Sequence, residues 1–296
     1  MNTTTKPKAP TWIHAEHPNA DEIRILVDRF GLEERFIRDA LDRDEVPHFE
    51  SIGDYTYIIT RFAYKTKEGG IDTAPILFAL SSAKLITVSL EKLTAPDNIL
   101  PGGLQSSSHD PAEILLKILL DIDAEYDHFI HETSKRIRSM LRNIGRRNVK
   151  TETFIRFAHI EDDMNDFLSS LAPTNSVLKH LRDHKIVSSL GKKSALIDTV
   201  ILNNEQSINT CENNLKAIDS IRRTYTLLNS SRLDRTIKIL TLTSVFISIP
   251  TMFFSMYGMN VALPWMRHDA VFIGIMALCL FTVLTALVVM RKKHIF

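Results

Sequence analysis

The residues best suited to chemistry are hydroxyl side chains inside an apolar stretch near the C-terminus. They recur in steps of four, three and four residues, as Ser244, Ser248, Thr251 and Ser255. A helix places such a series along one face. The surrounding segment 239–259 carries no charge and is long enough to cross a hydrocarbon core of about 30 Å. A hydroxyl stripe on a membrane-spanning helix faces either neighbouring protein or water in a pore. The pattern leaves both alternatives open.

The stripe extends in both directions along the chain. Toward the N-terminus the same face continues through Thr241, Leu240, Ile237 and Asp234, and the stretch ends in Tyr257, Gly258, Met259 and Asn260. One interpretation is structural, because Gly ends helices and Asn caps them. The other is ion recognition, because Mg²⁺ sheds water reluctantly and a neutral carboxamide oxygen can bind its water shell. One helix cannot enclose a pore, so ion recognition requires a ring of identical chains.

A long helix must carry this stripe. Between Gly191 and Pro250 there is no Pro or Gly, so we expect one continuous helix from Ser194 to Tyr257. Its first two-thirds has a heptad-like seam that requires helical neighbours. The seam consists of Ile197, Ile201, Asn204, Ile208, Cys211, Leu215, Ile218, Arg222 and Tyr225. The polar members Asn204 and Arg222 favour a wide bundle with some water access, although a helix lying on its own domain fits the pattern as well.

A second apolar segment, 270–290, follows the first after a short connection. The two segments therefore form a hairpin whose outer ends lie on one side of the membrane. Positive residues flank both outer ends, at Arg232, Arg235 and Lys238 and at 291–293. Since positive residues favour the cytoplasm, both termini are expected there. Trp265 would then lie at the outer interface.

The N-terminal part is expected to form an α/β or α+β domain. Trp12–His14 suggests a short strand, and Asn19 with Glu22 suggests a capping box before a helix that ends at Phe30. A second helix is expected from Phe36 toward Pro47. The β-rich runs are 49–64, interrupted by Gly53-Asp54, then 76–80 and 85–90.

Two more helices, 112–148 and 151–171, are expected after a Gly/Ser loop, with Pro173 and Gly191 as breaks. The first ends in a basic run of Lys135, Arg136, Arg138, Arg142, Arg146, Arg147 and Lys150. The second contains an acidic run of Glu161, Asp162, Asp163 and Asp166. If the helices are antiparallel, the two runs can form a solvated, salt-bridged face. RNA or anionic-lipid binding by the basic run and a divalent-ion site at the acidic run are the alternatives.

Composition gives no support to an enzyme or a nucleic-acid-binding protein. The 296 residues carry a formal charge of +1 and two cysteines, so neither nucleic acid nor a disulfide framework is indicated. Phosphate-binding Gly-Lys-Ser, Gly-x-Ser-x-Gly and His-Glu-x-x-His motifs are absent from the sequence. His180 and His184 can share a helix face, but two histidines do not complete a zinc site.

The string from Tyr257 to Asn260, at the outer end of the first of two C-terminal spans, resembles the CorA-type divalent metal ion transporter family. The segment 30–42, with Pro47 and Gly53-Asp54-Tyr55 beyond it, resembles the N-terminal domain of that family. The resemblance implies a funnel-shaped homopentamer in the cell (inner) membrane, with the first spans around the pore. The predicted domains are 1–110 (cytoplasmic α/β), 111–190 (helical hairpin), 191–236 (stalk helix), 237–257 (first transmembrane helix), 258–269 (outer loop), 270–290 (second transmembrane helix) and 291–296 (basic cytoplasmic tail).

The family arrangement assigns roles along the predicted pore. Asn260 would recognise a hydrated ion, the hydroxyls would line its path, Ile237 and Leu240 would form an apolar constriction, and Asp234 would add a carboxylate ring. Mg²⁺ is the expected substrate, with Co²⁺ or Ni²⁺ in addition, and no other cofactor is expected. A proton-coupled Zn²⁺ transporter and a non-transporting membrane scaffold or sensor are the alternatives.

The sequence departs from the family in two places. The segment 261–266 after the motif carries no acidic residue, and the family's stalk aspartate for sensing Mg²⁺ corresponds to Arg223, with Asp219 nearby but offset. Gating by intracellular divalent ions is therefore left open.

Overall fold

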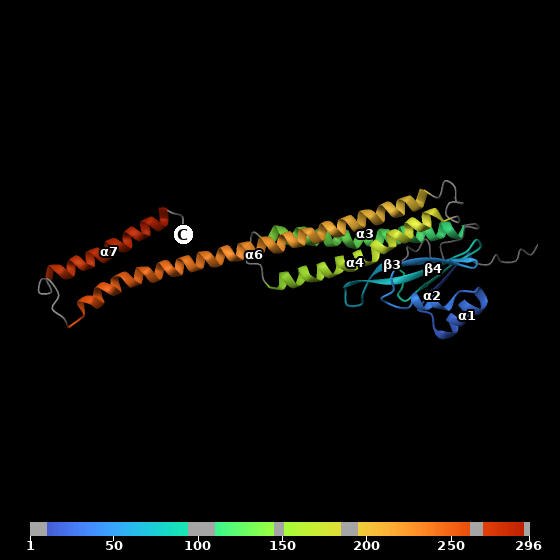
Figure 1. Cartoon of the computed structure of the whole chain (residues 1–296), viewed down its shortest axis with the longest axis horizontal. Coiled ribbons are helices and arrows are strands. Elements are labelled where there is room, and N and C mark those ends of the chain that lie inside the picture. Colours follow the sequence, from blue (N-terminus) through green and yellow to red (C-terminus); the bar gives the residue numbers. More distant parts are fainter. Residues whose placement is uncertain (1–10, 94–109, 145–150, 185–194, 261–268, 293–296) are drawn as a thin grey trace, which may run out of the picture. The chain divides into compact units, whose positions relative to one another are not determined.

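A computed structural model describes residues 11–93, 110–144, 151–184, 195–260 and 269–292. Contacts divide the chain into two units, Met1–Ser220 and Ile221–Phe296. Figure 1 shows the sheet and helices of the first unit and the helices of the second.

The first unit is built on a five-stranded sheet in the order β1-β5-β4-β3-β2. Its strands are β1 (Trp12–Glu16), β2 (His48–Ile52), β3 (Tyr55–Lys65), β4 (Ile71–Leu80) and β5 (Leu85–Ser89). β1 pairs with β5 in parallel, and the other pairs are antiparallel. The sheet confirms an α/β N-terminal part with β-rich runs broken at Gly53-Asp54.

Two short helices, α1 (Ala20–Phe30) and α2 (Glu34–Asp39), cover one face of the sheet. Asn19 Oδ1 accepts from the N–H of Glu22 at 3.0 Å, and the Glu22 carboxylate accepts from the N–H of Asn19 at 2.8 Å. This reciprocal pair confirms the predicted capping box. Gly31 ends α1 with a φ of 72°, a left-handed conformation that L side chains rarely adopt. Phe36 and Tyr57 stack at 4.1 Å between ring centroids inside this layer.

The other face of the sheet carries α3 (Pro111–Ile144) and α4 (Thr151–Asp183). Side chains alternate along the strands, so Thr60, Phe62 and Phe78 are buried on this side. The ring of Tyr126 on α3 meets that of Phe167 on α4 edge to face at 5.4 Å. These contacts make the helical layer and the sheet one packed unit.

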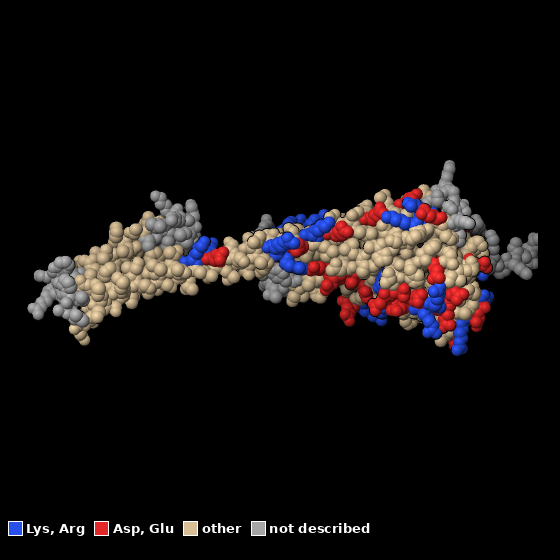
Figure 2. Space-filling model, viewed as in Figure 1, with Lys and Arg blue, Asp and Glu red and all other residues tan. Residues whose placement is uncertain are grey.

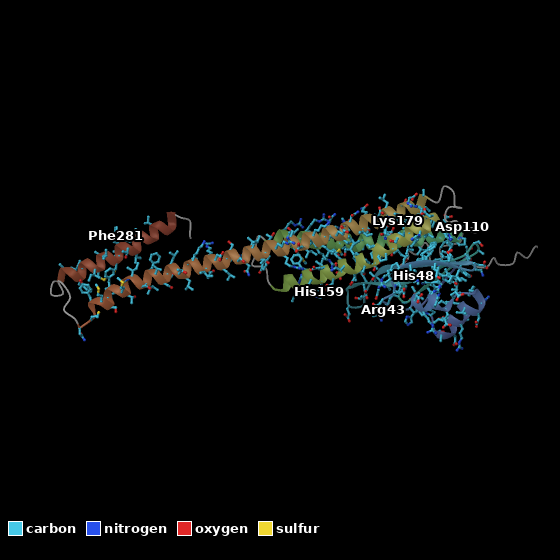
Figure 3. All side chains as sticks on the ribbon, in the orientation of Figure 1. Arg43, His48, Asp110, His159, Lys179 and Phe281 are labelled. Carbon is cyan, nitrogen blue, oxygen red and sulfur yellow. The ribbon has the colours of Figure 1, made fainter. Side chains whose placement is uncertain are left out.

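The start of α6 (Ala195–Tyr257) packs as a third helix on α3 and α4. Lys179 of α4, labelled in Figure 3, pairs with Glu205 of α6 at 2.8 Å. Ile197, Ile201 and Cys211 are buried, and Asn214 Nδ2 donates to Ser134 Oγ of α3 at 2.8 Å. The seam therefore has helical neighbours, as predicted. The expected water access is wrong for Asn204, which is 0% exposed, because helices close over it.

Three expectations about element ends are wrong, namely the end of α2, the start of β4 and the break at Pro173. α2 ends at Asp39 well before Pro47, and turn hydrogen bonds follow, such as Leu41 N–H to Arg38 O at 3.0 Å. β4 begins at Ile71 although it contains Pro75. The pairing with β5 starts only at Ile76, so the missing N–H of Pro75 interrupts no ladder there.

The predicted break at Pro173 is also wrong, because α4 continues through it to Asp183. Ser170 and Leu171 before it and Val177 and Leu178 after it are buried. This burial on both sides offsets the hydrogen bond that proline removes. The predicted break at Gly191 lies outside the described residues.

The second unit contains the rest of α6 and α7 (Asp269–Lys292). α6 continues through Pro250 and ends at Tyr257, as predicted. Figure 1 shows α7 beside the C-terminal part of α6, and Cys279 of α7 is 7% exposed. The predicted outer loop, including Trp265, lies outside the described residues.

Candidate functional site

The hydroxyl stripe lies on the exposed surface of α6. Ser244, Ser248, Thr251 and Ser255 are all exposed, as are Asp234 and Thr241. Ile237 and Leu240 are 60% and 67% exposed. The structure therefore places every predicted pore-lining residue on a surface that a single chain leaves open.

The stripe hydroxyls are oriented by the helix itself. Ser244 Oγ donates to the carbonyl of Leu240 at 3.0 Å, and Ser248 Oγ donates to that of Ser244 at 2.8 Å. Thr251 Oγ1 donates to the carbonyl of Ile247 at 2.7 Å. Because these three protons are used within the helix, the oxygens of Ser244, Ser248 and Thr251 offer only lone pairs to their surroundings. At these three positions the stripe is a row of hydrogen-bond acceptors.

Backbone hydrogen bonds cap the C-terminal end of α6. The N–H of Gly258 donates to Phe254 O at 2.9 Å, and that of Met259 donates to Met256 O at 3.4 Å. A Cβ on Gly258 would lie 3.2 Å from Phe254 O, which is closer than most Cβ contacts. Asn260 is exposed. These two backbone bonds cap the helix, so the Asn260 carboxamide is available at the surface.

Among the described residues, one helix is long and apolar enough to cross a membrane. It is α6, and none of its most apolar window is buried. In α7 the apolar run described, Phe272–Thr285, is shorter than the roughly 20 residues that a spanning helix needs. The second span therefore stays a prediction.

The alternative metal sites, at the acidic run and at His180 with His184, receive no structural support. Within the ranges that the structure describes, no group of three or more His, Cys, Asp or Glu side chains is placed to hold a metal ion. His180 and His184 instead pack their rings against Phe49, at 6.4 and 5.6 Å between centroids. Asp219 and Arg223 are both exposed, and the correspondence of Arg223 to the family's sensing aspartate stays a prediction.

The basic and acidic runs come near each other at Arg136 and Asp163, and the salt-bridged face between them stays a prediction. Arg136 forms an ion pair with Glu132 at 3.7 Å and lies close enough to Asp163 to lower the pKa of that carboxyl, while burial, the larger effect, raises it. Arg146, Arg147 and Lys150 lie outside the described residues.

Sequence reasoning missed a set of buried polar groups in the bundle. Asp123 of α3 is 5% exposed, and burial raises its pKa to about 8. Burial also raises the pKa of Cys211 to about 12 and that of Tyr126 strongly. The only sequence signal was a lone acidic residue on the apolar face of a helix.

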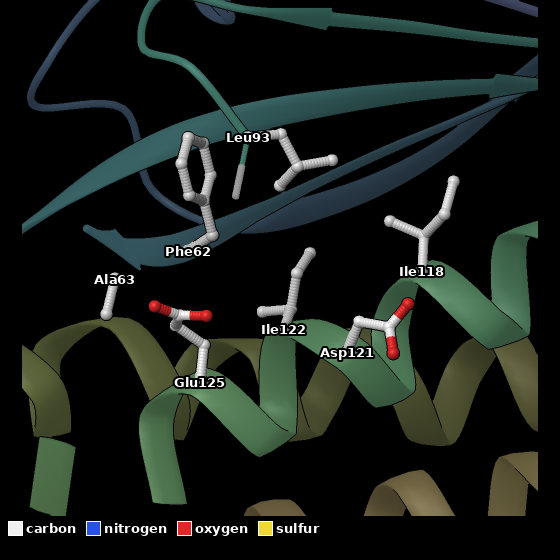
Figure 4. A pocket seen from close by; sticks show the side chains of 7 residues that line it. All are labelled: Phe62, Ala63, Leu93, Ile118, Asp121, Ile122 and Glu125. Carbon is white, nitrogen blue, oxygen red and sulfur yellow. The ribbon is translucent and has the colours of Figure 1, made fainter. Parts of the chain in front are cut away.

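A small cavity lies between α3 and the sheet (Figure 4). It measures about 10 Å³ and is lined by Phe62, Ala63, Leu93, Ile118, Asp121, Ile122 and Glu125. Burial raises the pKa of Asp121 and of Glu125. The volume is that of about one water molecule, which is too small for an organic substrate.

Solved structures with a similar fold include the following three. The complete CorA magnesium transporter from Methanocaldococcus jannaschii is 17% identical, with a TM-score of 0.85 over 99% of this chain and 93% of that chain. The full-length CmaX protein is 14% identical, with a TM-score of 0.77 over 96% and 91% of the two chains. The ZntB cytoplasmic domain from Vibrio parahaemolyticus RIMD 2210633 is 14% identical, with a TM-score of 0.63 over 78% and 93%.

A comparison with functionally curated proteins finds no match. The family model described as CorA-like Mg²⁺ transporter protein matches residues 7–292. This match covers the sheet, the helical bundle and the stripe of α6 together. The chain therefore belongs to the CorA-like Mg²⁺ transporter family, within the CorA-like divalent cation transporter superfamily.

Proposed function

We propose that this chain is a passive divalent-cation channel, with Mg²⁺ as the main substrate and Co²⁺ or Ni²⁺ as additional ones. The observation that carries the proposal is the acceptor stripe of α6, which leads to an exposed Asn260. A hydrated cation presents outward-pointing water hydrogens. Acceptor oxygens match those hydrogens without replacing the water.

The path needs several copies of α6. In a homopentamer, the arrangement that family membership favours, the stripes of the first spans surround a central pore. The Asn260 carboxamides then form a ring at the outer mouth that binds the water shell of the ion. Tyr257, Gly258 and Met259 hold that ring at the helix end. Membrane lipid covers the other apolar faces of α6 and α7.

The opposite end of the pore provides a gate. Ile237 and Leu240 are exposed apolar residues on the stripe face, and a ring of such residues can block ions by dewetting. Asp234, one turn before them, adds a carboxylate ring that attracts cations. Inward movement of a divalent ion is favoured by roughly 4.6 kcal/mol per 100 mV of interior-negative potential, so no coupled energy source is required.

The topology follows the distribution of charge. We place the protein in the cell (inner) membrane with both termini in the cytoplasm, because Arg232, Arg235 and Lys238 precede the first span and Arg291 follows the second. The outer loop then connects the two spans on the other side.

Proton-coupled Zn²⁺ transport is the second candidate. The observation that favours it is the likeness of the first unit to the ZntB cytoplasmic domain. Met259 stands against it, since zinc transporters of this superfamily often differ at that position. A scaffold without transport is the outcome left if the assembled protein carries no ion.

Uptake into proteoliposomes tests the proposal. Mg²⁺, Co²⁺, Ni²⁺ and Zn²⁺ entry is measured under an interior-negative potential and, separately, under a proton gradient. We expect potential-driven Mg²⁺ entry that Asn260→Ala reduces or makes unselective. Zn²⁺ entry that follows the proton gradient, with little Mg²⁺ flux, would move the protein to the second candidate. Absence of any flux from assembled protein would refute both.

A further inference from the structure

A stripe of unpaired positive charge lies on α3. His131, Lys135, Arg138 and Arg142 follow one another in steps of four, three and four residues, and all are exposed. The neighbouring Arg136 is paired with Glu132. Lys135, Arg138 and Arg142, in contrast, form no ion pair with any residue that the structure describes. We call His131, Lys135, Arg138 and Arg142 the basic stripe.

An unpaired negative face lies on α4. Asp162 and Asp166 are exposed, and no described cation forms an ion pair with either carboxylate. Burial raises the pKa of Asp166, and repulsion from Asp72 of β4 and from Asp162 raises it further, against a weaker attraction from Arg61. The repulsion means that a cation approaching this acidic pair would be stabilised.

The acidic pair continues into an open polar cleft of about 380 Å³ in the first unit. Asp44, Glu45, Asp72 and Asp166 line the cleft together with two arginines. Arg61 bonds the carbonyls of Arg43 and Glu45, each at 2.8 Å, and Arg43 pairs with Glu91 at 2.5 Å and with Asp72 at 3.9 Å. Four carboxylates therefore stand against two guanidinium groups. Figure 2 shows acidic residues gathered over this part of the surface. The cleft therefore keeps an excess of negative charge.

The basic stripe and the acidic pair lie at the same level of the bundle. Asn214 of α6 contacts both Ser134 Oγ of α3, at 2.8 Å, and Met164 Sδ of α4, at 3.8 Å. Ser134 and Met164 are therefore level. Because α3 and α4 run in opposite directions, Arg138 is level with residues near 160, while Asp162 is level with residues near 136. The two charged surfaces overlap along the helix direction.

This common level is what a closed ring requires. In a cyclic oligomer, each copy presents one face to its neighbour and a different face to the copy on its other side. Complementary faces at the same height along the helices close into a ring when the symmetry axis is parallel to the helices. Faces at different heights produce an open helical filament.

We propose that the basic stripe of one copy docks onto the acidic pair and adjoining cleft of the next copy. This inference rests on the homo-oligomer of the proposed function and names its cytoplasmic contact. An anionic lipid on the basic stripe would leave the acidic pair uncompensated, and a metal ion at the acidic pair would leave the basic stripe uncompensated. A second copy satisfies both, and the ion pairs give the interface its register.

Charge exchange in the full-length protein tests the contact. One variant is Lys135→Glu with Arg138→Glu, the basic residues level with the acidic pair, another is Asp162→Arg with Asp166→Arg, and a third combines all four. Oligomer distribution is measured in detergent by light scattering. We expect each two-residue variant to associate about tenfold more weakly, and the four-residue variant to recover. The matched control, Lys67→Glu with Lys92→Glu, reverses two exposed charges elsewhere and should assemble like the wild type.

A cross-link provides a second measurement that does not depend on stability. Chains carrying only Arg138→Cys are co-expressed with chains carrying only Asp162→Cys, and each is also expressed alone. We expect a disulfide-linked dimer in the mixture and none from either variant alone. Such a dimer would join two copies at this contact. Absence of that dimer from an oligomer that assembles normally overturns the inference.

Other outcomes also decide the question. If the basic-stripe variant assembles normally but loses binding to phosphatidylglycerol vesicles, the partner is lipid and the inference is wrong. It is equally wrong if the acidic-pair variant assembles normally but loses a Mg²⁺-dependent change in unfolding temperature. Uptake is measured separately. If the wild-type oligomer carries Mg²⁺ and the charge variants assemble normally, the inference is wrong and the proposed function stands. If the wild type assembles but carries no ion, only the proposed function is wrong.

Discussion

Thr251 Oγ1 donates its proton to the main-chain oxygen of Ile247 at 2.7 Å, and Thr243 Oγ1 makes the equivalent bond to Ile239 at 2.8 Å. The two threonines therefore have the same local hydrogen bond and the same exposed setting. They differ in position, because Thr251 belongs to the stripe while Thr243 lies about a quarter turn away from it. Comparing variants at these two positions therefore separates a role of the hydroxyl in the pore from a role in helix structure.

Thr251→Val should reduce Mg²⁺ flux, whereas Thr243→Val should not. Valine keeps the shape of threonine but removes the acceptor oxygen. A hydrogen bond contributes about 1 kcal/mol net, so the rate should fall by at least roughly fivefold, the effect of one lost contact, because every copy around the pore loses its acceptor. Flux per oligomer in proteoliposomes measures the effect. Equal loss in both variants would assign the hydroxyls to helix packing.

Gly258→Ala should impair selection at the outer mouth. Its Cβ would lie 3.2 Å from Phe254 O, so the helix end must shift and displace Asn260. Gly274→Ala in α7 is the matched control, because a Cβ there has no neighbour within 4 Å. We expect the ratio of Mg²⁺ to Co²⁺ uptake to change in the first variant and to stay constant in the second. Identical ratios in both would show that Gly258 does not position Asn260.

Local and periodic features could be predicted from the sequence. The capping box at Asn19 depends on residues three apart, and the stripe of α6 follows from helical spacing alone. Both are visible without knowing what packs around them. The role of Asn260 is different, because it depends on further copies of the chain, and it stays a prediction.

Features that depend on packing could not be predicted. Pro173 suggested a break, but the burial of Leu171 and Val177 keeps α4 continuous. Asn204 suggested water access, yet its side chain is 0% exposed. Asp123 gave only one weak signal, an acidic residue on an apolar helix face, because its burial arises when the sheet and helices distant in sequence pack around α3.

Replacing Asn204 by leucine should stabilise the bundle or leave it unchanged. Asn204 is 0% exposed, and neither polar atom of its carboxamide has a hydrogen-bond partner among the described residues. A buried polar atom without a partner costs about 1–3 kcal/mol, and leucine has a similar branched shape. Thermal unfolding in detergent measures the change, with Ile208→Leu as control. A destabilisation of about 2 kcal/mol or more would show that the carboxamide is satisfied in solution.

Asp123 should make the folded protein less stable as the pH rises. Burial raises the pKa of Asp123 from 3.8 to about 8, so the folded state keeps a proton that the unfolded state has lost. The contribution of this bound proton to the free energy of unfolding is fully present below about pH 4. It is lost as the pH rises through about 8, at up to about 1.4 kcal/mol per pH unit. Asp123→Asn removes the titrating group, so its unfolding temperature should fall less between pH 5 and 9 than that of the wild type.

The exposed Asp127 of the same helix supplies the control for this measurement. Asp127→Asn removes the same charge without changing a buried group, so its pH profile should follow that of the wild type. The raised pKa values of Asp121, Glu125 and Asp163 act in the same direction, so part of the slope should remain in Asp123→Asn. Parallel profiles for all three proteins would mean that Asp123 is ionised in the folded bundle, and that water or a cation reaches it there.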